Sequence, residues 1–240
     1  MSVWREVAET LKPPRGDRHG PLVPMMVALT LVTGVVDATS YLELGHVFVA
    51  NMTGNVVFLG FALAGAHGLS AASSLIALGA FLLGALAGGR LGARRAGHRG
   101  HLLRAACAVQ APLLALALAL ALVAGEPLHT AGRYGLIVTM ALAMGVQNAT
   151  AQRLAVPELT TTVLTRTLTG VVSEASVVGG EGAKLGRRAV AVTAMLLGAV
   201  TGALLVLHVA IAVALAVAVS IVLAVGVAVH ALSHDGAAWV

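Results

Sequence analysis

The chain has 240 residues, of which 58% are hydrophobic and only 10% are charged, and its net charge is +5. Several apolar runs approach or exceed the ~20 residues that cross a bilayer as a helix, so the composition predicts an integral membrane protein. The arginines cluster between apolar runs, which is typical of cytoplasmic membrane loops and argues against a nucleic-acid partner. The single cysteine, Cys107, excludes an internal disulfide.

The N-terminal segment, residues 1–20, is polar and is expected to be a cytoplasmic tail. The Pro13–Pro14 pair prevents a long helix there. Trp4, Val7 and Leu11 are spaced to form one short apolar face that would suit a membrane surface. A mobile tail is the other reading, and the sequence leaves both open.

The first half of the membrane region is expected to contain three full spans, at Leu22 to about Leu44, Ser70–Gly89 and Ala105–Ala124. Residues 45–68 are ambiguous, because a polar, glycine-containing approach (46–55) precedes a short apolar helix (about 56–66). This segment is long enough to cross the bilayer, but its composition favours a broken helix.

The second half is expected to open with a span at Arg133–Thr150, followed by a second ambiguous and more polar segment, Gln152–Gly180. Residues 189–230 contain no charged side chain. A single helix of that length would be roughly twice the ~30 Å thickness of the hydrocarbon core. We therefore expect two spans joined by a tight turn between Gly202 and Val209.

Two short strings recur in the same order. Residues 34–39, GVVDAT, return as GVQNAT at 145–150, which is 111 positions later. Residues 80–88, AFLLGALAG, return as AMLLGAVTG at 194–202, which is 114 positions later. Nearly equal offsets indicate an internal duplication. Coincidence in a chain rich in Ala, Gly and Leu is the alternative.

Charge decides between eight spans and six. If both ambiguous segments crossed, the basic residues would divide almost evenly between the two sides of the membrane, against the positive-inside rule. If each segment enters and leaves on one side, nearly all basic residues become cytoplasmic. The sequence thus predicts an all-α polytopic membrane protein with six transmembrane helices plus two re-entrant or broken helices, arranged as two inverted repeats (about 22–124 and 133–230).

That arrangement places one membrane domain at 21–230 and a short C-terminal tail at 231–240, with both termini in the cytoplasm. Similar layouts occur in aquaporin-type channels, but the chain has no Asn-Pro-Ala motif. The likeness is one of architecture and is not evidence of water transport.

The strings GVVDA (34–38) and FVANMTGNVV (48–57), with GVQNA (145–149) and LTTTVLT (159–165) in the second half, resemble the YoaK-like family of bacterial membrane proteins. The resemblance covers about residues 22–228. It implies a polytopic protein of the cell envelope, located in the bacterial inner (plasma) membrane, and it brings no known activity or ligand.

Polar residues inside the apolar regions are the candidate site, because polar groups at membrane depth are costly unless they face protein or water. Half-helices beginning near Thr53–Gly54 and Thr161–Thr162 would point free N–H groups and a positive dipole end at the midplane, which suits an anion or a polar neutral solute. The candidate substrate-binding residues are Asp37, Asn51, Thr53, Asn55, Gln147, Asn148, Thr161, Thr162 and Thr165. Alternatively, these side chains only satisfy irregular backbone.

Asp37 is the one acid well inside the first span, and its counterpart in the second repeat is the neutral Asn148. It would serve either as a proton-coupling site or as the ion-pair partner of Arg166. Glu174 follows Arg166 by eight positions, so the two would lie on one helical face and belong to the same ion-pair or coupling group.

No metal, cofactor or enzyme signature stands out. The nine histidines form no HExxH motif, and the chain has no Walker motif and no GxSxG. We expect no cofactor and no catalytic activity. The favoured function is a small polar-solute or anion transporter or channel, with the lipid bilayer as its surroundings and a homo-oligomer left open. The alternative is a non-transporting scaffold, sensor or assembly partner whose polar motifs only tie helices together.

Overall fold

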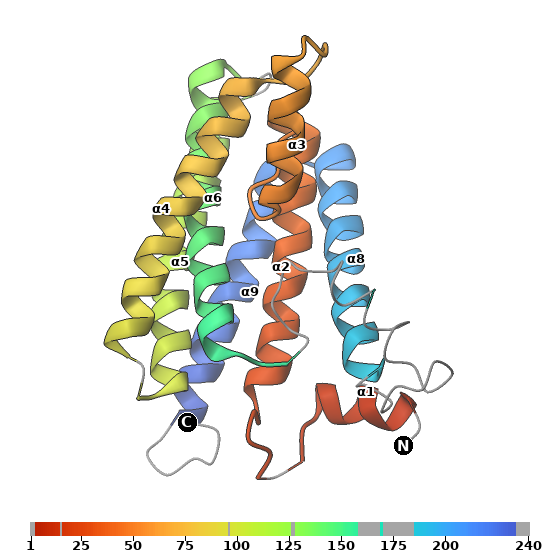
Figure 1. The fold of residues 1–240 in the computed structure, drawn as a ribbon, viewed down its shortest axis with the longest axis vertical. Helices are drawn as coiled ribbons and strands as arrows, with labels where there is room; N and C mark the ends of the chain where they lie inside the picture. Colours follow the sequence, from red (N-terminus) through yellow and green to blue (C-terminus); the bar gives the residue numbers. More distant parts are fainter. Residues whose placement is uncertain are drawn as a thin grey trace.

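The computed structural model describes residues 3–14, 16–95, 97–125, 128–157, 169 and 185–233. The labelled elements in this part of the chain are all α-helices (Figure 1). They are α1 (Val3–Leu11), α2 (Leu22–Glu43), α3 (Met52–Leu63), α4 (Ala71–Arg94), α5 (Arg99–Ala124), α6 (Thr130–Leu154), α8 (Leu185–His208) and α9 (Ile211–Leu232).

Five of these helices, α2, α4, α5, α8 and α9, are long and apolar enough to cross a membrane. Helix α6 has a similar length, 25 residues, but is less apolar because it carries side chains such as Gln147 and Asn148. In the described part of the chain the fold is all-α as expected, and the long apolar helices fit a membrane protein. The turn between the last two spans lies at Val209–Ala210, at the edge of the stretch in which the sequence placed it.

The long helices pack in two glycine-lined pairs. In the pair of α2 and α8, a Cβ atom added to Gly202 would lie 2.7 Å from the carbonyl oxygen of Val35, so α8 crosses α2 at backbone contact. In the pair of α4 and α6, a Cβ on Gly88 would lie 2.8 Å from the carbonyl oxygen of Val146. Small residues permit such close approach of helices, as is common in membranes.

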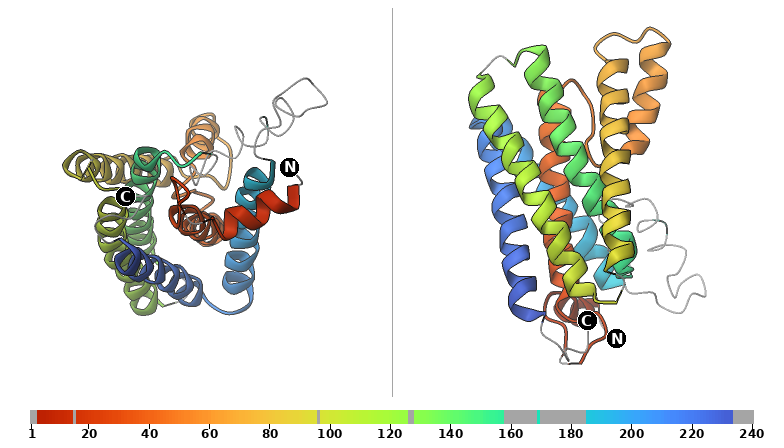
Figure 2. Two further views of the ribbon diagram at one scale, coloured as in Figure 1. Left: turned by 90° about the horizontal axis from the view of Figure 1, so that it is seen from below. Right: turned by 90° about the vertical axis from the view of Figure 1, so that its left-hand side faces the viewer.

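Helices α5 and α9 connect the two pairs. Helix α5 packs against α6 and against α9, and α9 packs in turn against α2, so these two helices form one side of the bundle (Figure 2). The core is built where these helices meet, from fully buried residues such as Leu29, Leu114, Met140 and Val222. The glycine-lined pairs lie on the other side, where α3 packs on α4.

Basic residues gather at one end of the bundle. At this end α2 and α8 begin, α4, α6 and α9 finish, and α1 lies crosswise to the long helices (Figure 1). The described basic residues in the segments at this end are Arg5, Lys12, Arg18, Arg90, Arg94, Arg95, Arg99, Arg104, Arg153, Arg187 and Arg188. Arg133, near the start of α6, lies toward the opposite end.

Candidate functional site

The chain turns back on itself after α2. Residues 45–51 run alongside α2 toward the middle of the bundle, and α3 then returns to the end where α4 begins (Figure 1). Helix α3 has 12 residues, which is about 18 Å at ~1.5 Å per residue and too short for a ~30 Å hydrocarbon core. The helix begins at Met52, close to the start near Thr53–Gly54 expected for a half-helix and earlier than the apolar run from about 56.

Asp37 holds this returning segment in place. Its Oδ1 atom accepts the backbone N–H of Val49 at 3.1 Å and that of Ala50 at 2.8 Å. Asp37 is only 4% exposed. Buried backbone N–H groups outside regular structure need an acceptor, and the carboxyl oxygen of Asp37 supplies it. The acid in α2 therefore provides the bonds that let the chain leave helical structure inside the bundle.

Asn55 fixes the other side of the same turn. Its Oδ1 accepts the N–H of Phe48 at 2.9 Å, and its Nδ2 donates to the carbonyl oxygen of Phe48 at 2.6 Å. The Phe48 ring stacks on those of Tyr41 and Phe58, with centroids 5.1 and 5.8 Å away, and the Tyr41 and Phe58 centroids lie 6.0 Å apart, so the three rings form one cluster. A Cβ on Gly54 would come within 2.6 Å of the Phe48 ring, so glycine is needed there. These contacts connect the start of α3 to the segment that precedes it.

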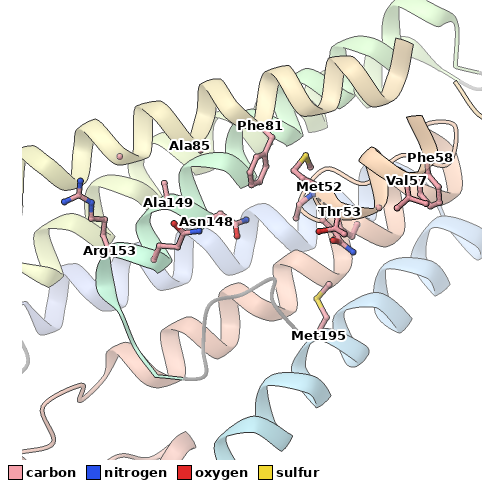
Figure 3. A pocket seen from close by; sticks show the side chains of 16 residues that line it. Met52, Thr53, Val57, Phe58, Phe81, Ala85, Asn148, Ala149, Arg153 and Met195 are labelled. Atoms are coloured by element: carbon pink, nitrogen blue, oxygen red, sulfur yellow. Dashed lines mark hydrogen bonds between the residues drawn. The ribbon is translucent and has the colours of Figure 1, made fainter. Parts of the chain in front are cut away.

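A cavity of about 930 Å³ lies next to the start of α3 (Figure 3). It extends from α3 along α4 and α6 toward Arg153, and Met195 of α8 lies across from α3. The described residues that line it are Asp37, Ala50, Asn51, Met52, Thr53, Gly54, Val57, Phe58, Phe81, Ala85, Gly89, Asn148, Ala149, Gln152, Arg153 and Met195. The lining therefore draws on both glycine-lined pairs and on α3.

Four of the candidate residues that the structure describes line this cavity, namely Asp37, Asn51, Thr53 and Asn148. Asn51 occupies the position before α3, yet its side chain makes no capping hydrogen bond. The amide of Asn148 donates to the carbonyl oxygen of Met144 at 3.0 Å, one turn earlier in α6. Asn55 is not among the lining residues, since its amide is engaged with Phe48.

Gln147 also lies away from the cavity, in a buried amide network. Its Oε1 accepts from Nε2 of Gln110 at 2.6 Å, and its own Nε2 donates to Thr33 Oγ1 at 2.9 Å and to the carbonyl oxygen of Leu29 at 3.2 Å. The network joins α5, α6 and α2. The remaining candidates, Thr161, Thr162, Thr165, Arg166 and Glu174, lie outside the described residues.

Several lining residues were not singled out from the sequence. Gln152 follows Asn148 by four positions, so both occupy one face of α6, and this spacing was available as a signal. Arg153 is one of the basic residues that the charge pattern assigned to the cytoplasmic side as a group. Phe81 and Met195 belong to apolar runs, and they occupy equivalent positions in the duplicated AFLLGALAG and AMLLGAVTG strings.

The cavity offers mixed polarity. The start of α3 presents backbone N–H groups and the positive end of a helix dipole, and Arg153 adds a positive charge toward the basic end of the bundle. Asp37 contributes the acidic group of the lining. Among the described residues no group of three or more His, Cys, Asp or Glu side chains is placed to hold a metal ion. The arrangement suits recognition of a small polar molecule by hydrogen bonds.

A second polar cluster lies at the basic end of the bundle. The Arg99 guanidinium donates to the carbonyl oxygen of Leu154 at 2.7 Å and to that of Arg18 at 3.0 Å, and it lies 3.0 Å from Nδ1 of His19. Asp17 accepts the N–H of His19. Burial and the nearby Arg99 charge lower the pKa of His19 from its ordinary value of 6.5. The cluster ties the segment before α2 to the ends of α5 and α6.

Comparison with known proteins assigns the chain to a family. Residues 25–228 match the model of the family described as Protein of unknown function (DUF1275). The chain is also similar to the UPF0700 transmembrane protein YoaK of Bacillus subtilis (strain 168), with 34% identity over 158 residues, or 63% of this chain. The match spans 66% of that relative, just under two thirds of its length. No solved structure matches the chain significantly.

Proposed function

The chain belongs to the DUF1275 family of membrane proteins, and on that premise we propose that it is a transporter or channel for small polar solutes, anions included. The supporting observation is the cavity of about 930 Å³ beside the start of α3, lined by Asp37, Thr53 and Asn148. Polar side chains inside a membrane bundle mark solute or ion paths by default. Small-molecule sites commonly combine an apolar wall with a few polar groups of this kind.

The proposed framework is a pair of inverted repeats with six spans. Gly34 of α2 faces the backbone of Met195 in α8, and Gly145 of α6 faces the backbone of Phe81 in α4. These two contacts correspond residue for residue under the offsets of 111 and 114 positions. Because α2 and α6 run in opposite directions (Figure 1), a two-fold axis in the membrane plane would relate them. Inverted repeats with broken helices at the midplane are a recurring plan of transporters.

The basic end of the bundle is assigned to the cytoplasm on the positive-inside rule. This assignment places α1, the loop between α4 and α5 and the end of α9 inside the cell. Labelling of Gly97→Cys in a Cys107→Ser background with an impermeant thiol reagent tests it. Reaction in inside-out vesicles but not in intact cells is expected, and the reverse result would overturn the orientation.

In this account the two glycine-lined pairs form the walls of the path, and α3 forms its end. The solute would contact the N–H groups at the start of α3, with Asn148 and Gln152 on the opposite wall. The stack of Tyr41, Phe48 and Phe58 would close the path toward the non-basic end. Arg153 would favour entry of anions from the basic end.

A scaffold or assembly role is the second candidate, favoured by the Gln110–Gln147 network and by Asn55. These buried amides are fully used in tying elements together, which is what a structural role for polar motifs requires. The cavity distinguishes the two candidates, because a scaffold needs no path lined by Asp37, Thr53 and Asn148.

The test is a flux screen on purified protein in liposomes, with chloride, nitrate, phosphate and acetate as anions and urea and glycerol as neutral solutes. Flux of at least one class, reduced by Thr53→Val and unchanged by Ser220→Ala, is expected. Ser220 is exposed on α9 and bonds only within its own helix at Ala216, so its variant is the matched control. Absence of flux for every solute would favour the scaffold.

A further inference from the structure

Helix α1 is docked on the bundle and is not a free tail. It lies crosswise to the long helices at the basic end (Figures 1 and 2). Glu6 Oε2 accepts the backbone N–H of Gly186 at 2.9 Å, in the first turn of α8. A Cβ on Gly186 would lie 2.5 Å from Glu6 Cβ and 2.8 Å from the Val7 nitrogen. Only glycine permits this contact, so α1 is fixed against the start of α8.

A different face of α1 is apolar and uncovered. Trp4 is 82% exposed and Leu11 is 53% exposed, and Ala8 lies between them on the same side of the helix. Arg5, Glu9 and Lys12 form the charged side. Docking on α8 thus uses one face and leaves a tryptophan and a leucine outside the protein core.

The position of this face indicates what covers it. A helix that lies at right angles to membrane spans, at their ends, lies along the bilayer surface. Leu196 and Leu197, midway along α8, are exposed like other apolar residues of the long helices, so α8 presents an apolar surface outward and α1 lies at the end of that helix. Tryptophan prefers this interface, because its ring is apolar and its N–H is polar.

The basic residues on and beside α1 indicate which class of lipid this helix would bind. Arg5 and Lys12 lie on α1, and Arg187 lies beside Gly186 in α8. Basic residues next to a bilayer attract anionic headgroups. We propose that α1 is an interfacial helix that binds an anionic phospholipid surface through Trp4, Ala8 and Leu11 and thereby holds the start of α8 at the membrane boundary. This inference is independent of transport.

Trp4 is itself the probe for the test. The chain has two tryptophans, so Trp239→Phe leaves Trp4 as the sole indole. This full-length variant is reconstituted in liposomes of phosphatidylcholine alone or of phosphatidylcholine with phosphatidylglycerol. The phosphatidylcholine carries bromine on its acyl chains, at either a shallow or a deep position. The fluorescence of Trp4 should be quenched more by bromine at the shallow position than by bromine at the deep position. It should also be protected from iodide in the aqueous phase. The bromine quenching and the protection from iodide should both be stronger in liposomes that contain phosphatidylglycerol.

Two variants sharpen the result. Leu11→Glu places a charge on the lipid face and should raise iodide quenching of Trp4 several-fold, whereas Glu9→Gln on the charged side should not. Free access of iodide to Trp4 in the parent protein would overturn the proposal. Protection from both iodide and bromine would also overturn it, since protein would then cover the face. Equal behaviour in the two lipid compositions would refute the assignment to anionic lipid.

Discussion

The Oδ1 atom of Asp37 lies 2.8 Å from the backbone nitrogen of Ala50, thirteen positions further along the chain. This hydrogen bond joins a continuous span to a segment that has left helical structure inside the bundle. Because the same oxygen also accepts from Val49, one carboxylate supplies the bonds that keep residues 45–51 folded back. Asp37 thus positions the start of α3 and also lines the cavity.

Removal of this acceptor should cost stability. Asp37→Ala leaves two buried N–H groups without an acceptor, at about 1–3 kcal/mol each, whereas Asp37→Asn keeps an oxygen at the same place. Thermal unfolding in detergent should therefore show a large loss for Asp37→Ala and a small loss for Asp37→Asn. If Asp37→Asn were as harmful as Asp37→Ala, and Arg166→Gln rescued it, the charge would instead belong to a structural ion pair.

Two glycines of α4 allow a matched pair of substitutions that tests the close contact between α4 and α6. A Cβ on Gly84 would overlap the carbonyl group of Leu142 in α6, while a Cβ on Gly79 would meet nothing within 4 Å. Gly84→Ala should lower the free energy of unfolding by about 1–3 kcal/mol through overpacking. Gly79→Ala should be neutral or stabilising by up to ~1 kcal/mol. Equal effects of the two substitutions would argue against the close crossing of α4 and α6.

A double-mutant cycle would measure how much the hydrogen bond between Gln110 and Gln147 contributes to stability. Either single change to leucine strands a buried amide and should cost about 1–3 kcal/mol. The double variant should lose less than the sum of the two, because it removes both halves of that bond, although Gln147 also donates to Thr33 and Leu29. Unfolding of the four proteins in one detergent measures the coupling, and strict additivity would show that the two side chains act independently.

The His19 cluster predicts a pH dependence of stability. Burial and Arg99 lower the pKa of His19 in the folded protein, so the unfolded chain binds more protons below about pH 6.5. The stabilisation that comes from keeping the His19 imidazole neutral is fully present above that pH. It is lost as the pH falls toward the lowered pKa of His19 in the folded protein. Unfolding measured from pH 7.5 to 5 should show this decline in the parent protein. The decline should be smaller in His19→Gln, and an identical slope would contradict the assignment.

Sequence patterns predicted the bounds of several long helices, because apolar runs and charge clusters mark where such helices begin and end. The first span, expected at Leu22 to about Leu44, is α2 at Leu22–Glu43. Helix α5 starts earlier than its apolar run, at Arg99, where the side chain of His98 accepts the N–H of His101. Local capping of this kind does not appear in hydropathy.

The site was harder to predict, because its bonds join distant positions. Asp37 is 12 and 13 positions away from Val49 and Ala50 in the chain, and only the folded structure brings them together. Asn55 and Gln147 resembled the cavity residues in type and depth, yet they serve the backbone and another amide. Polar character inside an apolar run indicates a need for partners, but it does not say whether those partners are protein or solute.

The central claim is that the cavity beside α3 is a water-filled solute path, and Thr53 is the position that tests it most directly. In a Cys107→Ser background in liposomes, Thr53→Cys should react with an impermeant thiol reagent, and the modification should stop flux. Ala77→Cys, fully buried in α4, should not react. If Thr53→Cys reacted as slowly as Ala77→Cys and flux were unaffected by the reagent, the cavity would not be a solute path.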